Sequence, residues 1–150
     1  MIGPRNGERP TSVPGSPSDQ TRWSAYAARV EGEPEITISF PGTPDFLRLA
    51  RLTSADAGSR AGFDYEDIDD LRIAVSELCA LITGPDSKVT LGFGVARGTV
   101  TVEGRATPGY LADNELSRTI IEAVVDELEV AAADGTSSFR CVKHANLPAS

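Results

Sequence analysis

A regular apolar stripe in the middle of the chain places the strongest limit on its fold. Between residues 64 and 84, apolar side chains recur every three or four positions, at Ile68, Leu71, Val75, Leu78 and Ile82. This spacing puts them on one face of an α-helix. Asp64 and the acidic residues after it suit the helix start, and Gly84-Pro85 suits its end. The chain therefore contains an amphipathic helix whose apolar face must be covered by a second layer.

The segment before this helix predicts a strand and another helix. In residues 35–40, apolar and polar side chains alternate, which is the period of a half-buried strand. Thr43 and Pro44 then suit the N-cap and first position of a helix over residues 44–61. The side chains that we expect on one face of this helix are Phe46, Leu49, Ala50, Thr53 and Ala57.

Two hairpins and a third helix are predicted after the central helix. Residues 88–96 and 99–106 alternate as strands joined by a tight turn, and residues 114–127 have helical spacing. A last hairpin over residues 127–143 turns at Asp134-Gly135. The order β-α-α-β-β-α-β-β predicts an α/β fold. We expect a two-layer sandwich of a mixed, mainly antiparallel sheet covered on one face by three helices.

Residues 1–33 differ in composition from the rest of the chain. Among their Gly, Ser and charged residues stand Pro4, Pro10, Pro14 and Pro17. Such a segment buries too little apolar surface to offset its ordering entropy. We therefore predict a flexible tail over residues 1–33, one folded domain over 34–144 and a short C-terminal tail over 145–150.

Three apolar residues, Trp23, Tyr26 and Val30, interrupt the polar N-terminal tail. Their spacing suits a short helix or a patch that docks a partner. A fortuitous aromatic residue in a disordered tail explains them equally well, so both interpretations stay open.

The charge of the chain argues against direct binding of nucleic acid. The net charge is −8, from 14 basic and 22 acidic residues, and no basic stripe is visible. Proteins that bind nucleic acid usually carry such a stripe. A basic protein partner is compatible with this charge.

Hydropathy and cysteine spacing exclude further classes. No run approaches the ~18 to 20 apolar residues that span a bilayer, and the N-terminus lacks the apolar core of a signal peptide. We therefore expect a cytoplasmic protein that does not contact a membrane. Cys79 and Cys141 lie far apart in the chain and have no metal-ligand spacing, so no metal site is expected.

The segment DLRIAVSELCALI (Asp70 to Ile82) resembles the second helix of anti-sigma factors built on the GHKL ATPase, or histidine-kinase-like, fold. The serine-kinase anti-sigma factors of actinobacteria are the most similar branch. Further matching stretches are FPGTPDFLRLARL, GFDYEDIDDL and IIEAVVDELEV, so the resemblance covers roughly residues 35–143. It implies a homodimeric regulator that sequesters a sigma factor in a partner-switching system and is relieved by a STAS-type anti-anti-sigma antagonist.

The motifs that hold nucleotide in this family are altered in the chain. The family's helix carries a Glu that acts as general base and, four residues later, an Asn that helps hold Mg²⁺; Glu77 fits the first position, but Leu81 takes the second. An Asp that reads adenine is replaced by Arg105, and Thr107 replaces the first glycine of the motif after it. The stretch ADNELSRT before the third helix lacks the glycines that would close over the phosphates.

These departures imply a vestigial catalytic site. A metal and a phosphate cradle contribute most of the catalysis in phosphoryl transfer. We therefore expect no ATP or Mg²⁺ cofactor and no kinase activity, with Glu77 as the remnant of the general base. The alternative is an ATP-dependent serine/threonine protein kinase that phosphorylates the antagonist, with Glu77 as its base and Mg-ATP as its cofactor.

The resemblance places partner contacts on the exposed face of helix 44–61. In related anti-sigma factors this face helps to dock the sigma factor and the antagonist, and an arginine that matches Arg51 takes part. We accordingly predict Arg51, Arg48 and Leu47 as partner-binding residues, because arginine often anchors protein interfaces. A solvated surface position is the competing explanation for both arginines, and ordinary packing is the competing explanation for Leu47 and Leu52.

Overall fold

The central helix predicted from the apolar stripe forms as α3 (Tyr65–Ile82) in a computed structural model that describes residues 34–146. Asp64 caps it, because its Oδ1 accepts a hydrogen bond of 2.9 Å from the backbone N–H of Asp67. The helix buries Leu71, Ala74, Val75, Leu78, Cys79 and Ile82 completely. The stripe therefore becomes the centre of the helical layer, as the sequence predicts.

The helix before α3 starts in a different form than predicted, and of the predicted inner face it buries Ala50 and Ala57 but not the large residues. Pro44–Phe46 make a 3-10 turn, η1, and the α-helix α2 runs over Leu47–Ala61. Its buried side chains are the small ones, Ala50, Ser54, Ala57 and Ala61, with Gly58 among them. Phe46 and Leu49, predicted on the inner face, are exposed. This part of the prediction was wrong because α2 packs closely on α3, and only small residues leave room for that approach.

The sheet contains five strands in the order β1-β2-β3-β5-β4. Their bounds are β1 Ile36–Pro41, β2 Lys88–Ala96, β3 Thr99–Thr107, β4 Glu127–Ala133 and β5 Thr136–His144. All four pairings between described strands are antiparallel. The predicted two-layer α/β architecture is thus confirmed, and no parallel pair occurs in the described part of the sheet.

The third helix, α4, spans Glu115–Val124 and is shorter than predicted. Asn114 caps it through a 3.0 Å hydrogen bond from the backbone N–H of Ser117 to its Oδ1. It ends before residue 127 because Val125 is extended and the N–H of Asp126 already bonds to Val142 O on β5, at 2.8 Å. The hairpin after it turns at Asp134 and Gly135, both with positive φ, as predicted.

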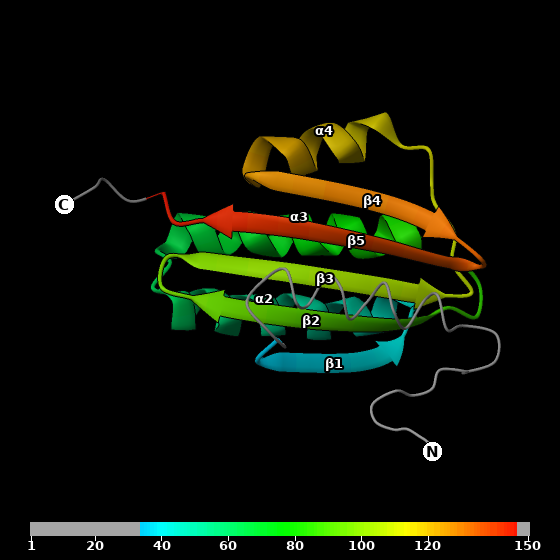
Figure 1. Cartoon of the computed structure of the whole chain (residues 1–150), viewed down its shortest axis with the longest axis horizontal. Coiled ribbons are helices and arrows are strands. Elements are labelled where there is room, and N and C mark those ends of the chain that lie inside the picture. Colours follow the sequence, from blue (N-terminus) through cyan, green and yellow to red (C-terminus); the bar gives the residue numbers. More distant parts are fainter. Residues whose placement is uncertain (1–33, 147–150) are drawn as a thin grey trace, which may run out of the picture.

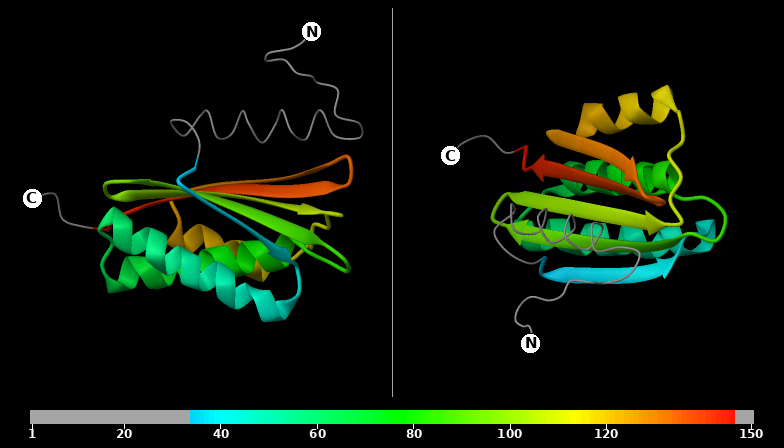
Figure 2. Two further views of the ribbon diagram at one scale, coloured as in Figure 1. Left: turned by 90° about the horizontal axis from the view of Figure 1, so that it is seen from below. Right: turned by 45° about the vertical axis from the view of Figure 1, so that its right-hand side comes forward.

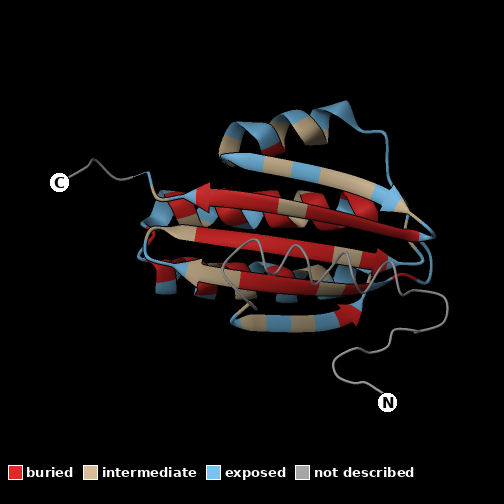
Figure 3. Ribbon diagram, viewed as in Figure 1, coloured by how far each residue is buried: buried red, intermediate tan, exposed pale blue. Residues whose placement is uncertain are grey.

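The helices lie on one face of the sheet, which leaves two unlike faces (Figures 1 and 2). Figure 3 shows the buried residues running along the central strands and the facing sides of α2 and α3. The side chains that face the helices include Val89, Leu91, Phe93, Val102 and Phe139, all nearly inaccessible. Alternate residues face away, and we call this side of the sheet the outer face.

Some predictions fall outside the described residues. The N-terminal tail over residues 1–33, with Trp23, Tyr26 and Val30, lies there, as do residues 147–150. The start of the predicted C-terminal tail is described: Ala145 N–H bonds to Gly98 O at 2.7 Å, and Asn146 N–H to Asp67 Oδ2 at 3.0 Å. None of the described helices combines the length and the apolar character that a membrane span needs.

Candidate functional site

Glu77, the predicted remnant of a general base, lies half-buried on the side of α3 that meets α4. Its Oε1 accepts a 2.7 Å hydrogen bond from the hydroxyl of Ser117, in the first turn of α4. The same serine donates its backbone N–H to the cap residue Asn114. The carboxylate therefore ties the start of α4 to the middle of α3.

Leu81 occupies the next turn of α3 and is only 2% exposed. It belongs to the hydrophobic core, so a core contact stands where the family places a metal-binding amide. Ile73, about two turns earlier on α3, is 44% exposed. The apolar filling of this region is thus confined to the C-terminal half of α3.

Residues 108–114, which we call the strap, run from β3 to α4 along the C-terminal end of α3. The N–H of Tyr110 donates to Ile82 O at 3.1 Å, and the N–H of Ala112 donates to Leu81 O at 2.9 Å. The last carbonyls of a helix lack hydrogen-bond donors within the helix, and the strap supplies donors to two of these carbonyls. The end of α3 is therefore closed by backbone hydrogen bonds.

Side chains fix the start of the strap as well. The hydroxyl of Ser87 donates to Pro108 O at 2.6 Å, and the phenol of Tyr110 donates to Pro85 O at 3.2 Å. The Tyr110 ring lies over Gly84, where an added methyl group would overlap the ring carbons. Gly109 N–H donates to Gly135 O at 2.7 Å, which joins the strap to the last hairpin.

The two altered adenine positions do not join Glu77 in one site. Arg105 pairs with Thr90 and Ser138 across the sheet and belongs to the residues of the outer face, away from the helices. Thr107 ends β3, and its hydroxyl lies 3.0 Å from that of Thr136. Arg105 and Glu77 are therefore separated by the sheet.

The predicted partner-binding residues lie along the first turns of α2. Arg48 and Arg51 are exposed, whereas Leu47 is half-buried against the core. Arg51 Nη1 donates a long hydrogen bond of 3.4 Å to Ser76 Oγ on α3, which directs it along the surface shared by the two helices. Leu52, beside it, is 62% exposed. The structure thus brings two cations and an exposed leucine to one solvent-facing surface.

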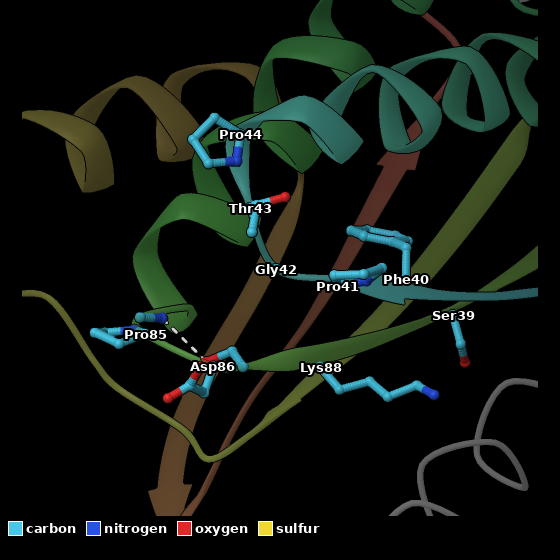
Figure 4. A pocket seen from close by; sticks show the side chains of 11 residues that line it. Ser39, Phe40, Pro41, Gly42, Thr43, Pro44, Pro85, Asp86 and Lys88 are labelled. Carbon is cyan, nitrogen blue, oxygen red and sulfur yellow. Dashed lines mark hydrogen bonds between the residues drawn. The ribbon is translucent and has the colours of Figure 1, made fainter.

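A pocket of about 700 Å³ opens at the end of β1 (Figure 4). It lies between the end of β1 and the loop that leads into β2, and it is lined by Ser39, Phe40, Pro41, Gly42, Thr43, Pro44, Gly84, Pro85, Asp86, Ser87 and Lys88. Apolar atoms make up most of its lining. None of the site residues predicted from the sequence lines it.

The residues around Glu77 differ from those that hold Mg-ATP in the family that the sequence resembles. One turn after Glu77 stands Leu81, which is buried and has no oxygen atom in its side chain, whereas Mg²⁺ requires oxygen ligands. Within residues 34–146, no group of three or more His, Cys, Asp or Glu side chains is arranged to hold a metal ion. The strap, which follows the altered adenine motif, is bonded to the end of α3.

Sequence reasoning missed the residues that close this region, Ser117 and Tyr110. Asn114 followed three residues later by Ser117 was a recognisable capping signal, but it did not reveal the bond to Glu77. Gly84-Pro85 was correctly predicted as a helix end. Nothing in its pattern shows that Tyr110 packs over the glycine, since that contact depends on the path of the strap.

Comparisons with known proteins identify relatives that share one name. Over 106 residues the chain is 38% identical to the serine-protein kinase RsbW of Listeria monocytogenes, which covers 70% of this chain and 53% of that protein. It is 28% identical over 129 residues to the serine-protein kinase RsbW of Bacillus velezensis, with 68% and 81% covered. The chain spans about half the length of the Listeria relatives. No protein-family model matches it.

A solved structure agrees on the fold. The crystal structure of the RsbU and RsbW domains of a Mycobacterium tuberculosis protein superposes with a TM-score of 0.57 at 18% identity. The match covers 77% of this chain and 34% of the solved one. At this identity the likeness establishes the arrangement of helices and strands and nothing about the chemistry.

Proposed function

Since the chain belongs to the RsbW group of GHKL-type regulators, we propose that it is an anti-sigma factor that sequesters an alternative sigma factor in a partner-switching system. A STAS-type antagonist releases the sigma factor in turn. The protein acts in the cytoplasm as a homodimer and carries out no phosphoryl transfer of its own.

The closed end of α3 is the observation that carries this proposal. Glu77 holds Ser117, Leu81 is buried in the core, and the strap bonds to the last carbonyls of the helix. A kinase needs this region to receive a metal and phosphates, and these contacts support the proposal that the protein uses neither. We therefore assign the function to partner binding at the protein's surface and not to chemistry at Glu77.

The surface of α2 is the part that we assign to the sigma factor. Arg48, Arg51 and Leu52 are exposed together there, and arginine with apolar neighbours is typical of interface anchors. Arg51 is also oriented by Ser76, so less side-chain entropy is lost when it binds. Leu47 supports this surface from below, since it packs against the core.

Two observations favour a second candidate, a serine-protein kinase. The relatives carry that name, and Glu77 fits the general-base position of the family that the sequence resembles. For this activity the strap would have to leave α3 and the Ser117 bond would have to break. Phosphorylation of the antagonist by the purified protein with Mg-ATP would establish the kinase.

Affinity measurements on α2 variants test the anti-sigma proposal. The sigma factor is identified by mass spectrometry after co-purification with the protein, and its affinity is then measured for the wild type, Arg51→Ala and Arg60→Ala. Arg51→Ala should weaken the complex by about 1 to 2 kcal/mol, roughly five- to thirtyfold. Arg60 is the matched control, because it is exposed at the other end of α2 and paired with Asp56 at 2.6 Å.

Two results would contradict this assignment. Equal affinities for the wild type and Arg51→Ala would remove Arg51 from the interface. Recovery of STAS-type proteins without any sigma factor would reject the anti-sigma function itself and leave a regulator of another kind.

A further inference from the structure

The outer face of the sheet is buried at its centre although α2, α3 and α4 all lie on the opposite face (Figure 2). Glu103 on β3 is 2% exposed, Thr101 is 8% exposed and Val142 on β5 is 4% exposed. Each alternates with a residue that faces the helices, so their side chains point outward. None of the described helices covers them.

A row of charged residues crosses this face. Glu103 pairs with Arg140, which pairs with Glu129 on β4. Arg140 also donates to Glu127 at 3.3 Å, and its Nε lies 3.8 Å from Glu103 Oε2. Three carboxylates thus lie in this part of the face, with the guanidinium groups of Arg140 and of Arg105, which follows Glu103 on the same side of β3. The carboxylates are in excess here, so this part of the face suits a basic occupant.

On β2 and β1, the same row across the sheet contains only small residues. Glu103 lies opposite Gly92 on β2, and Gly92 lies opposite Thr37 on β1. Gly94 follows on the same face, and a methyl group added there would have no neighbour nearer than 3.9 Å. Gly92 and Gly94 thus form a track without side chains beside the Glu103 carboxylate, which we call the glycine track. Such a track accommodates a bulky aromatic side chain.

The chain itself contains a segment with the complementary pattern. At about 100° per residue, a helix over residues 20–31 would place Arg22, Trp23, Tyr26, Arg29 and Val30 within roughly 120° of arc. This face has two cations, two aromatic rings and one aliphatic side chain. Glu31, the segment's one acidic residue, falls on the opposite side.

The connection to the sheet is short enough to bring the two together. The segment ends five residues before Ile36, where β1 begins, and five residues span at most about 17 Å. Ile36 lies in a cross-strand row with Phe93 and Val102, next to Glu103. Strands are about 4.8 Å apart, so β3 is roughly 10 Å from β1.

We propose that residues 20–31 dock on the outer face of the sheet as an amphipathic helix of the same chain. Trp23 and Tyr26 lie on the glycine track, and Arg22 and Arg29 face the carboxylates of Glu103 and Glu129. The protein thus supplies its own third layer. This contact is distinct from the α2 surface assigned to the sigma factor, and the two can be tested separately.

Trp23 is the only tryptophan in the chain, so its fluorescence reports on this contact directly. In the full-length protein its emission should lie at shorter wavelength than in a peptide of residues 16–33, and acrylamide should quench it several-fold less. Arg22→Glu with Arg29→Glu should abolish both differences, whereas Arg5→Glu with Arg9→Glu, outside the segment, should leave them unchanged. Circular dichroism checks that the domain stays folded.

A nitroxide label locates the docking site. Thr37→Cys places the label in the row of Gly92 and Glu103, and it should quench Trp23 strongly. Ser59→Cys on α2, in the opposite layer, should not. The native thiols of Cys79 and Cys141 are buried and do not compete for the label.

Three outcomes would overturn the proposal. Trp23 emission and quenching equal to those of the peptide would show that the segment does not dock. Shielding that disappears on dilution would make a second copy of the chain the occupant. Shielding that survives both charge reversals, or equal quenching from Thr37 and Ser59, would remove the outer face as its site.

Discussion

Two buried thiols make the stability of the folded protein depend on pH in the alkaline range. Burial raises the pKa of both Cys79 and Cys141 to about 12, from 9.0 for a free thiol. Above pH 9 the thiols of the unfolded chain ionise while those of the folded chain stay protonated. The folded state then holds more protons, so the free energy of unfolding falls as pH rises from about 9 toward 12.

The expected loss is about 1 kcal/mol per thiol between pH 8 and pH 10. Urea unfolding at both pH values measures it. The matched control is the variant Cys79→Ala with Cys141→Ala, which is less stable at every pH because of the cavities but should have a shallower alkaline slope. Equal slopes in the two proteins would show that other groups determine the alkaline loss.

Lys143 is the second residue whose burial has a measurable consequence. Its ammonium lies 3.7 Å from Asp67 Oδ1 and 3.5 Å from Asp70 Oδ2, and Asp67 is 1% exposed. Lys143→Met should cost about 3 kcal/mol, because it leaves the Asp67 carboxylate buried without its cation. Lys88→Met, at an exposed position on β2, should cost less than about 0.5 kcal/mol.

Chemical denaturation of these variants is interpretable through a double-mutant cycle. Asp67→Asn combined with Lys143→Met should recover part of the loss, because the buried carboxylate at position 67 is then removed together with its cation. Additive losses in the double variant would contradict the pairing of Lys143 with Asp67.

At the scale of single residues, sequence reasoning found Glu77 and Leu81 because helical spacing is local. It did not find Ser117, the hydrogen-bond partner of Glu77, which lies 40 residues later in the chain. It aligned Arg105 with the adenine-reading Asp of the family, whereas strand alternation puts Arg105 on the outer face of the sheet, away from Glu77. Residue types are readable from a motif, but partners depend on how distant elements pack.

The strap is the element on which the closed end of α3 depends, and Gly84 is its weakest point. Gly84→Ala would press a methyl group against the Tyr110 ring, which must then move off the helix end. We expect a loss of about 1 to 3 kcal/mol in the free energy of unfolding, as for other overpacked positions. Urea unfolding at neutral pH, with the denaturant slope checked for constancy, measures it.

Two further variants identify the cause of that loss. Ser59→Ala, at an exposed position on α2, is the control, because that position takes no part in the contacts of the strap. With Tyr110→Ala in the background, Gly84→Ala should become nearly neutral, since the overlapping ring is gone. A Gly84→Ala loss that is the same with and without Tyr110 would contradict the steric explanation.

At the scale of elements, periodicity predicted α3 and both hairpins, where one face is apolar and the turn residues are distinctive. On the inner face of α2 it correctly predicted Ala50 and Ala57. It was wrong for Phe46 and Leu49, which are exposed. It also extended α4 by three residues, because the order of apolar and acidic residues over 125–127 fits a helix as well as a strand. The strap has no periodic signal, so its bonds to α3 were not predictable.

For the whole molecule, the order of elements was sufficient to predict the architecture. Short turns force neighbouring strands to be antiparallel, and three amphipathic helices require one covered face. The outer face could not be predicted in this way, because alternation alone describes it as solvated. The burial of Glu103 and Val142 departs from that expectation and motivates the docking proposal.

Binding linkage separates the two candidate functions for the molecule as a whole. A ligand that binds only the folded state at 100 times its dissociation constant stabilises it by about 2.7 kcal/mol, which raises the melting temperature by several degrees. A working nucleotide site would therefore give a clear thermal shift in millimolar Mg-ATP. With Leu81 buried and the strap bonded to α3, we expect a shift smaller than the error of the measurement.

The serine-protein kinase RsbW of Listeria monocytogenes is the positive control in the same buffer. Mg-GTP and Mg²⁺ alone distinguish a nucleotide effect from one of salt. A second variant, Leu81→Asn with Tyr110→Ala, restores a metal-binding amide and loosens the strap. A shift in this variant but not in the wild type would show that these two residues exclude nucleotide. A shift in the wild type would instead revive the kinase, since the strap must then open for Mg-ATP to bind beside Glu77.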